Sequence, residues 1–241
     1  MFYNGFVNHY QDLFPFREST FDFLRSQCPP DASRVLDLGC ATGHYAAAFA
    51  NAGYHSVGID LEPDMIKYAR SHYSAPQFHT MDMLNIPDLN QTFDLIYSTG
   101  NTLSHLDPAM LGKLTDNLRK VLNPGGVWLF QTVNWDYLLT LDRHEFPVLE
   151  APDKGLRFYR RYLSITNQGV IFRILLQQND KLLYDAEQTL YPVTAQQYQK
   201  IHENAGFKPV GHYADFKSNP FNPNVNSANI MIFKTTTWEG K

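Results

Sequence analysis

The feature that most constrains the fold of this chain is a regular alternation of short apolar runs with helical stretches between residues 34 and 133. Strands are expected in five apolar runs, at residues 34–38, 55–59, 77–81, 93–98 and 127–133. Helices are expected between them, at residues 43–52, 61–73 and 108–121. Strands that alternate with helices predict a doubly wound α/β fold, a mostly parallel sheet with helices on both faces.

The character of the sequence changes after residue 134. Three β-rich runs follow without a helix between them, at residues 156–166, 170–178 and 182–191. Turn-forming residues separate them, so we expect an antiparallel β insert over residues 134–192, after the fifth strand. A helix to about residue 204 and a last strand pair then complete a seven-stranded sheet. At 241 residues the chain is expected to form a single domain, residues 1–241.

Composition excludes several classes of protein. The net charge is -4 and no lysine- or arginine-rich run stands out, so we expect no nucleic-acid partner. No signal peptide and no run of 18 apolar residues is visible, so we expect a cytoplasmic protein that does not enter a membrane. The two cysteines, Cys28 and Cys40, lack the spacing of a metal site, and we expect free thiols and no metal.

Acidic or small residues stand where four of the expected strands end. The first strand runs into the glycine turn DLGCATG, with Asp37 at its start. Asp60 follows the second strand and suits the two hydroxyls of a ribose, and Asp82 follows the third and can accept from an adenine amino group. The fourth strand ends in STGN, where Thr99 and its small neighbours let a ligand approach the backbone. These ends together predict an adenosine site.

The glycine turn distinguishes between the two common adenosine cofactors. A dinucleotide loop has the pattern GxGxxG, because the pyrophosphate must lie against a helix N-terminus free of side chains. Here Ala41 and His44 occupy the second and third glycine positions, and Asp37 would repel a pyrophosphate. A cofactor with a sulfonium and an ammonium group fits better. An NAD(P)-dependent oxidoreductase and a non-catalytic protein that binds an adenosine cofactor stay open as alternatives.

The motifs DLGCATG, GID, MDM, FDLIYSTGN and LNPGG, in this order, resemble those of the class I S-adenosylmethionine-dependent methyltransferases. That family usually has DxGxGxG, and Ala41 replaces its middle glycine. The resemblance implies a Rossmann-like fold, S-adenosylmethionine as cofactor and methyl transfer as the activity. We expect the cofactor to be bound by residues at the four strand ends and in the helix after the second strand: Asp37, Gly39, Cys40, Ala41, Gly43, Asp60, Leu61, Met65, Asp82, Met83 and Thr99.

A narrower similarity concerns residues 3–19 and 99–106, which look like segments of glycine/sarcosine N-methyltransferases and related small-molecule enzymes. In that group an N-terminal segment folds over the cofactor and supplies aromatic residues and an arginine. Tyr3, Tyr10 and Arg17 stand at matching places. The similarity implies a helical lid over residues 1–30, but nothing in the sequence carries over glycine as the substrate.

The expected reaction is an in-line transfer of the methyl group to a nitrogen or oxygen atom of a small molecule. Such an enzyme has to align the acceptor and exclude water. Asn101 and His105, near the fourth strand end, are the candidate catalytic residues. Asn101, Arg157 and Tyr159 are the candidate substrate-binding residues, although the run RFYRRY places arginines on both faces of its strand. The sequence leaves a homodimer open.

Overall fold

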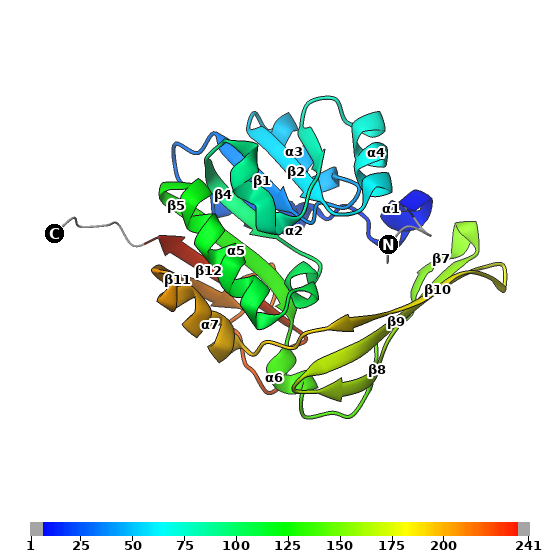
Figure 1. Ribbon diagram of the computed structural model, residues 1–241. Coiled ribbons are helices and arrows are strands. Elements are labelled where there is room, and N and C mark those ends of the chain that lie inside the picture. Colours follow the sequence, from blue (N-terminus) through cyan, green and yellow to red (C-terminus); the bar gives the residue numbers. More distant parts are fainter. Residues whose placement is uncertain (1–6, 236–241) are drawn as a thin grey trace.

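The computed structural model describes residues 7–235, so Tyr3 lies outside the described residues. Its main sheet has seven strands in the order β11-β12-β5-β4-β1-β2-β3 (Figure 1). Neighbours from β5 to β3 run parallel, and β12 is antiparallel to both β5 and β11. The strands are β1 Arg34–Leu38, β2 His55–Asp60, β3 Gln77–Thr80, β4 Phe93–Ser98, β5 Leu122–Val133, β11 Phe207–Tyr213 and β12 Ala228–Thr235. The predicted doubly wound sheet is confirmed.

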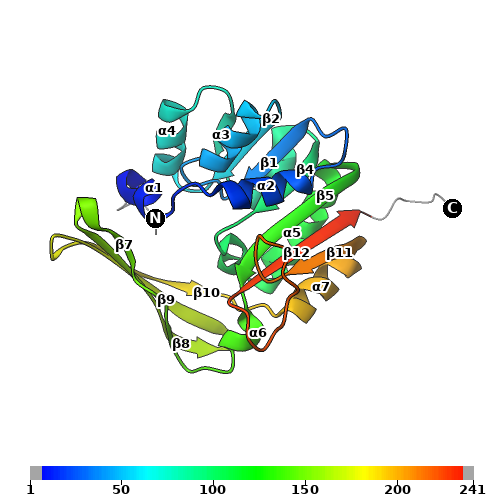
Figure 2. The same cartoon turned by 180° about the vertical axis from the view of Figure 1, so that it is seen from behind.

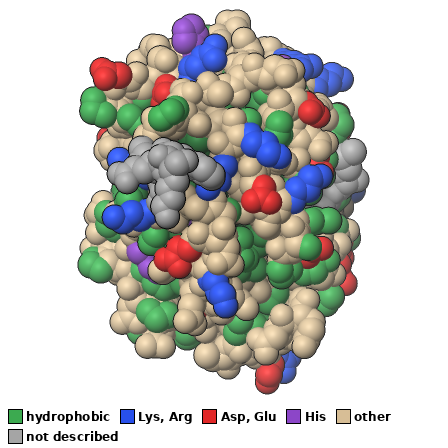
Figure 3. Space-filling view, turned by 60° about the vertical axis from the view of Figure 1, so that its left-hand side comes forward, with side chains coloured by type: hydrophobic (Ala, Val, Ile, Leu, Met, Phe, Trp, Pro, Cys, Tyr) green, Lys and Arg blue, Asp and Glu red, His purple; other side chains and the backbone are tan. Residues whose placement is uncertain are grey.

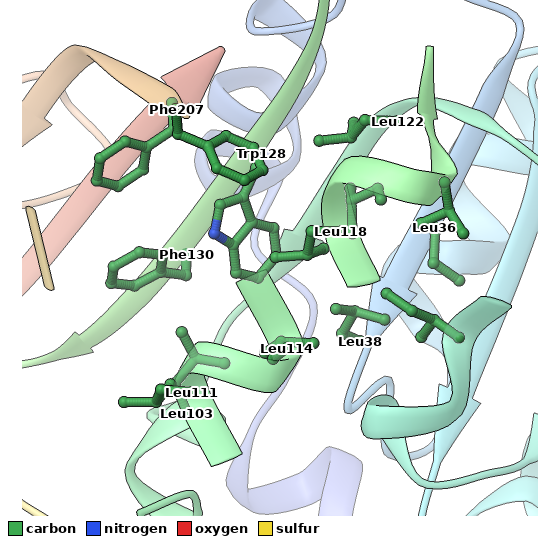
Figure 4. Close-up of a cluster of buried hydrophobic side chains, with 14 of the residues drawn as sticks. Leu36, Leu38, Leu103, Leu111, Leu114, Leu118, Leu122, Trp128, Phe130 and Phe207 are labelled. Carbon is green, nitrogen blue, oxygen red and sulfur yellow. The ribbon is translucent and has the colours of Figure 1, made fainter. Parts of the chain in front are cut away.

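Helices cover both faces of this sheet, because successive strand residues alternate between two cores. On one face Leu36, Ile96 and Trp128 pack against α5 and α7, as Figure 4 shows for Leu36 and Trp128 with Leu114 and Leu118 of α5. On the other face Val35 and Leu95 pack against α2 and α3. The helices are α2 Glu18–Ser26, α3 His44–Asn51, α4 Pro63–His72, α5 Pro108–Val121 and α7 Ala195–Asn204.

A second, five-stranded antiparallel sheet forms the predicted insert between β5 and α7. Its path is β10-β9-β8-β6, and β7 also pairs with β8. The insert begins with the short helix α6, Trp135–Leu138, and the strands are β6 His144–Glu145, β7 Leu149–Ala151, β8 Leu156–Thr166, β9 Gly169–Gln178 and β10 Lys181–Leu190. At its base the Ala195 backbone N–H donates to the Asp136 carboxylate over 2.9 Å, which ties the start of α7 to α6.

The N-terminal part of the described chain crosses between the two sheets. It consists of a 3₁₀ turn, Val7–His9, and the short helix α1, Tyr10–Leu13. Figures 1 and 2 show α1 between α4 and the tip of the insert. Within residues 7–235 no helix has both the length and the apolar character required to cross a membrane.

Charged side chains of both signs are mixed on the surface. On the face drawn in Figure 3, lysine and arginine side chains are interspersed with aspartate and glutamate. The composition is also close to balanced, with 20 basic and 24 acidic side chains. On that face, charges of opposite sign therefore lie near one another.

Candidate active site

The site is built on the edge where the parallel strands β1, β2, β3 and β4 end. The strand order changes direction between β1 and β4, and ligands of open α/β sheets bind at such a switch point. The turn after β1 lies here, held to β2 because the N–H groups of Gly39 and Cys40 both donate to the Ile59 carbonyl, at 2.8 and 2.9 Å.

Both glycines of this turn are required by backbone conformation and by space. Gly39 has φ +78° and Gly43 has φ +80°, in the left-handed region that side chains disfavour. A Cβ on Gly39 would lie 2.5 Å from the side chain of Thr102, and one on Gly43 would lie 2.5 Å from Phe78. The glycines therefore let neighbouring elements close on the turn.

Ala41 is the unusual residue of the turn, because it also has a positive φ, of 46°. Its backbone N–H donates to Asp60 Oδ2 over 2.8 Å, and the N–H of Glu62 donates to Oδ1 over 2.9 Å. Asp60 therefore joins the glycine turn to the end of β2, an interaction that the sequence did not reveal. Each carboxylate oxygen can accept a further hydrogen bond, so the predicted ribose contacts are still possible.

Asp37 is buried directly beneath the turn. The hydroxyl of Tyr97 in β4 donates to its Oδ2 over 2.9 Å. Burial raises the pKa of Asp37 to about 7, helped by the nearby charge of Asp60 and opposed by the Tyr97 hydrogen bond. Tyr97 was not predicted as a site residue. Two carboxyl groups so close to one turn favour a ligand that carries positive charge.

The turn after β4 is open to a ligand on one side. Gly100 has φ +75° and nothing within 4 Å of the position a Cβ would take. Next to it, Asn101 Oδ1 accepts from Ser104 Oγ at 2.7 Å and from the Val133 N–H at 3.0 Å. Trp135 Nε1 donates in turn to Ser104 Oγ over 2.9 Å. The Asn101 carbonyl oxygen therefore holds the turn to the end of β5 and the start of the insert.

His105 lies at the end of the same turn, half-buried, and burial lowers its pKa to about 4. An imidazole with that pKa is neutral near pH 7 and is only a weak general base. The neighbouring Asp107, and not His105, caps α5 by accepting from the Met110 N–H at 2.8 Å. Catalytic roles for Asn101 and His105 remain predictions.

The other predicted cofactor residues occupy different environments. Asp82 Oδ1 accepts from the Leu84 N–H at 2.8 Å and so caps a 3₁₀ segment, Met83–Leu89, while Met83 packs against the core. Leu61 is exposed at the edge, and Met65 is buried within α4.

Cys40 is buried, and burial together with the charges of Asp37 and Asp60 raises the pKa of its thiol. Thr99 is half-buried, and its carbonyl accepts from the Thr102 hydroxyl.

The N-terminal segment connects the glycine turn with the insert. Gln11 Nε2 donates to Thr42 Oγ1 over 3.2 Å and to the Tyr73 hydroxyl over 3.0 Å. On the other side, the ammonium group of Lys154 lies 2.7 Å from the Asp12 carboxylate, and Leu13 is buried in the cluster of the insert. Gln11 and Thr42 were missed because no local pattern indicates a contact between residues 31 positions apart.

Two residues of this segment were predicted as cofactor residues. Tyr10 packs against the apolar cluster of the insert. Arg17 is exposed at the start of α2, and its backbone N–H donates to the Tyr45 hydroxyl over 3.4 Å. Phe16 covers the start of α3, with its ring 5.2 Å from that of Tyr45 and 6.1 Å from that of His44. The segment therefore passes over the start of α3, directly after the glycine turn.

The insert has an inner face, which packs against Trp135 and Leu13, and an opposite, outer face. Phe158 and Tyr162 belong to the inner cluster, so Arg160 is on the inner side of β8 as well. Arg157 is on the outer side, exposed, with its guanidinium 2.6 Å from Asp180. This placement does not support the predicted substrate contacts from Arg157 and Tyr159, because both side chains leave the sheet on its outer face.

The inner face of β10 lies beside the strand edge that carries the site. The Tyr191 N–H donates to the Ser104 carbonyl over 2.8 Å. Burial raises the pKa of Tyr184, and the negative charge of Glu62 adds to this rise, so the two side chains interact electrostatically. Glu62 is buried at the start of α4 and makes no capping hydrogen bond with its side chain. The insert therefore approaches the end of β2.

Comparison with known proteins agrees with this geometry. The family described as "Methyltransferase domain" matches residues 35–126. YqeM of Bacillus subtilis (strain 168), which is named as a methyltransferase, is 25% identical over 228 residues, 90% of each chain. The ubiquinone biosynthesis O-methyltransferase of Xylella fastidiosa (strain 9a5c) is 31% identical over 151 residues, 59% of each chain. The amino pentose methyltransferase CalS10 of Micromonospora echinaspora, solved with bound S-adenosylmethionine, has a TM-score of 0.71 at 21% identity, covering 95% of both chains.

Residues 35–126 match a methyltransferase domain, and these comparisons together support a class I S-adenosylmethionine-dependent methyltransferase. Its cofactor is S-adenosylmethionine, and the residues at the strand edge fit this cofactor. Gly100 leaves open space, and Asp37 and Asp60 provide negative charge for a ligand with a sulfonium and an ammonium group. The oxidoreductase and the non-catalytic alternatives are therefore not supported.

The first prediction concerns Asp60. We expect Asp60→Ala to weaken S-adenosylhomocysteine binding at least about tenfold, because hydrogen bonds to a charged acceptor contribute roughly 1.5–3 kcal/mol. Titration calorimetry measures this, with Asp88→Ala, an exposed carboxylate on the 3₁₀ segment, as the control. The unaltered protein should bind NAD far more weakly than S-adenosylhomocysteine. Equal affinities for S-adenosylhomocysteine in Asp60→Ala and the unaltered protein would place the ribose elsewhere.

The second prediction concerns Ala41. A non-glycine residue in the left-handed region is strained by roughly 1–2 kcal/mol. Glycine relieves this strain in the folded state, but it also makes the unfolded chain more flexible, which offsets part of the stabilisation. We expect Ala41→Gly to raise the free energy of unfolding by about 0.5–1 kcal/mol, without loss of S-adenosylhomocysteine affinity. Urea denaturation followed by fluorescence measures the first quantity. A less stable Ala41→Gly protein would show that the Ala41 methyl group has a packing role that outweighs the strain.

Proposed function

We propose that this methyltransferase transfers its methyl group to a nitrogen or oxygen atom of a small molecule held between the strand edge and the insert. The observation that carries the proposal is the approach of β10 to the edge, shown by the Tyr191–Ser104 hydrogen bond, with the electrostatic interaction of Glu62 with Tyr184 beside it. A sheet that closes on the cofactor edge in this way favours a small acceptor over a large one. The names of similar proteins, a ubiquinone biosynthesis O-methyltransferase and the sugar N-methyltransferase KedS8, support both acceptor atoms.

In the proposed reaction, bound S-adenosylmethionine supplies a methyl group already activated by the sulfonium. The chain has to hold the acceptor in line and keep water out. The predicted lid covers residues 1–30, of which residues 1–6 lie outside the described residues; its described part is proposed to exclude water, since Gln11 and Leu13 already join the glycine turn to the insert. A neutral amine acceptor needs no strong base. For a hydroxyl acceptor, His105 is proposed to accept its hydrogen bond, since burial keeps the imidazole neutral.

Arg160 is proposed to select acceptors with a carboxylate or phosphate group. It shares the inner side of β8 with Phe158 and Tyr162, with its guanidinium 5.3 Å from the centre of the Phe146 ring, and it donates to the Pro147 carbonyl over 3.1 Å. A guanidinium fixed on two sides loses little freedom when it binds an anion in a two-pronged hydrogen bond. Arg157 and Arg161, on the outer side, serve as matched controls.

The test is a panel of amine, hydroxyl and carboxylate-bearing acceptors, with release of S-adenosylhomocysteine as the readout. Once an acceptor is found, we expect Arg160→Ala to raise KM at least about tenfold, with cofactor binding unchanged in calorimetry. Arg157→Ala and Arg161→Ala should keep full activity. If all three variants behave alike, Arg160 does not contact the acceptor.

Limited proteolysis tests the lid. We expect cleavage of the N-terminal segment around Gln11 and Arg17 to slow when S-adenosylhomocysteine is added, because the cofactor would hold the segment closed. Gln11→Ala should reduce this protection, since its side chain loses both the Thr42 and the Tyr73 hydrogen bonds. Cleavage at the same rate with and without the cofactor product argues against a lid.

A further inference from the structure

Gln131, near the end of β5, holds the open turn after β4 with two of its oxygen atoms. Its side-chain Oε1 accepts from the Gly100 N–H over 2.8 Å, and its backbone carbonyl accepts from the Asn101 N–H over 3.3 Å. Strand β5 lies next to β4, on the side away from β1 (Figure 1). Two consecutive N–H groups of the turn are therefore fixed by one residue, which the sequence did not indicate as part of the site.

The bond to Gly100 determines which way the Gln131 amide group is turned. A backbone N–H is a donor, so the amide atom that meets it is the oxygen, and the NH2 group points elsewhere. Gln131 is half-buried, and within residues 7–235 its Nε2 has no hydrogen-bond partner and is not enclosed. The residue therefore presents two N–H donors for which the described part of the chain supplies no acceptor.

Gln131 also lies on the face of the sheet to which the glycine turn leads. Leu129, two residues earlier in β5, packs in the core beneath α2 and α3, so the Gln131 side chain leaves the strand on that face. Helix α3 begins at His44, directly after the glycine turn. The two turns are in contact, since a Cβ on Gly39 would lie 2.5 Å from the Thr102 side chain. A ligand on the glycine turn therefore reaches the β4 turn within one strand spacing, about 4.8 Å.

The charges around the site indicate which part of the cofactor lies beside this amide. S-adenosylmethionine carries a sulfonium, an ammonium and a carboxylate group. Asp37 and Asp60, on the β1–β2 side of the switch point, attract the two cationic groups and repel the carboxylate. The carboxylate accepts hydrogen bonds and an amide NH2 group donates them. Gly100, with no atom within 4 Å of the position of a Cβ, leaves space for it at the β4 turn.

We propose that the Gln131 NH2 group binds the carboxylate of S-adenosylmethionine, while its Oε1 holds the Gly100 N–H. The two roles can be separated by Gln131→Glu. The carboxylate that this change introduces still accepts from Gly100, but it cannot donate to the cofactor and it repels the cofactor's own carboxylate. Gln91→Glu is the matched control, because it introduces the same charge before Phe93, at the opposite end of β4.

Titration calorimetry with S-adenosylmethionine and with decarboxylated S-adenosylmethionine tests the proposal, since the second ligand keeps the sulfonium and ammonium groups. We expect the unaltered protein and Gln91→Glu to bind S-adenosylmethionine at least about tenfold more tightly than the decarboxylated ligand. In Gln131→Glu this preference should disappear or reverse. An unchanged preference overturns the proposal. Equal weakening of both ligands also overturns it, because Gln131 then only shapes the turn.

A second variant keeps the test independent of the introduced charge. Gln131→Met has a side chain of similar length but lacks both the oxygen and the NH2 group. We expect it to lose the preference for the carboxylate-bearing ligand and to bind both ligands more weakly, because the turn loses its hydrogen bond. Circular dichroism checks the fold of each variant, and the Gln131→Met comparison stands by itself if Gln131→Glu does not fold. A full preference retained in Gln131→Met overturns the proposal.

Discussion

The hydrogen bond between the Ala41 N–H and the Asp60 carboxylate is the interaction on which the rest of the site depends. It joins the turn after β1 to the end of β2, where the Ile59 carbonyl already accepts from Gly39 and Cys40. The turn is thereby fixed on one side of the switch point, above the buried Asp37. The same carboxylate holds the Glu62 N–H at the start of α4. One side chain thus sets the relative positions of a turn, a strand end and a helix start.

A second hydrogen-bond network fixes the turn on the other side of the switch point. Asn101, Ser104 and Trp135 form a chain of hydrogen bonds from the turn after β4 to the first helix of the insert. Asn101 also accepts from Val133 at the end of β5. The insert is therefore held by the same groups that shape the β4 turn. A disturbance of the Trp135 side chain would reach the cofactor edge through only two hydrogen bonds.

Much of the fold could be predicted, because strand burial produces a local pattern. The runs ending at Asp60 and Ser98 are apolar and bounded by turn residues, so their place in a parallel sheet follows from sequence. The Tyr97–Asp37 and Gln11–Thr42 contacts could not be predicted, since they join residues far apart in the chain. The inward face of β8 was also ambiguous, because both sides of RFYRRY carry an arginine and an aromatic residue. Packing of Phe158 and Tyr162 in the inner cluster decides it.

The hydrogen bond between Asp136 and the start of α7 has a consequence for how such enzymes diversify. The chain leaves the main sheet after β5 and returns at α7, and this bond closes the loop of the insert at its base. Residues 137–193 therefore resemble a cassette whose two ends meet at one point of the scaffold. Replacement of this cassette changes what is presented to the cofactor while β5, α7 and the glycine turn keep their places. Acceptor choice can evolve in this segment separately from cofactor binding.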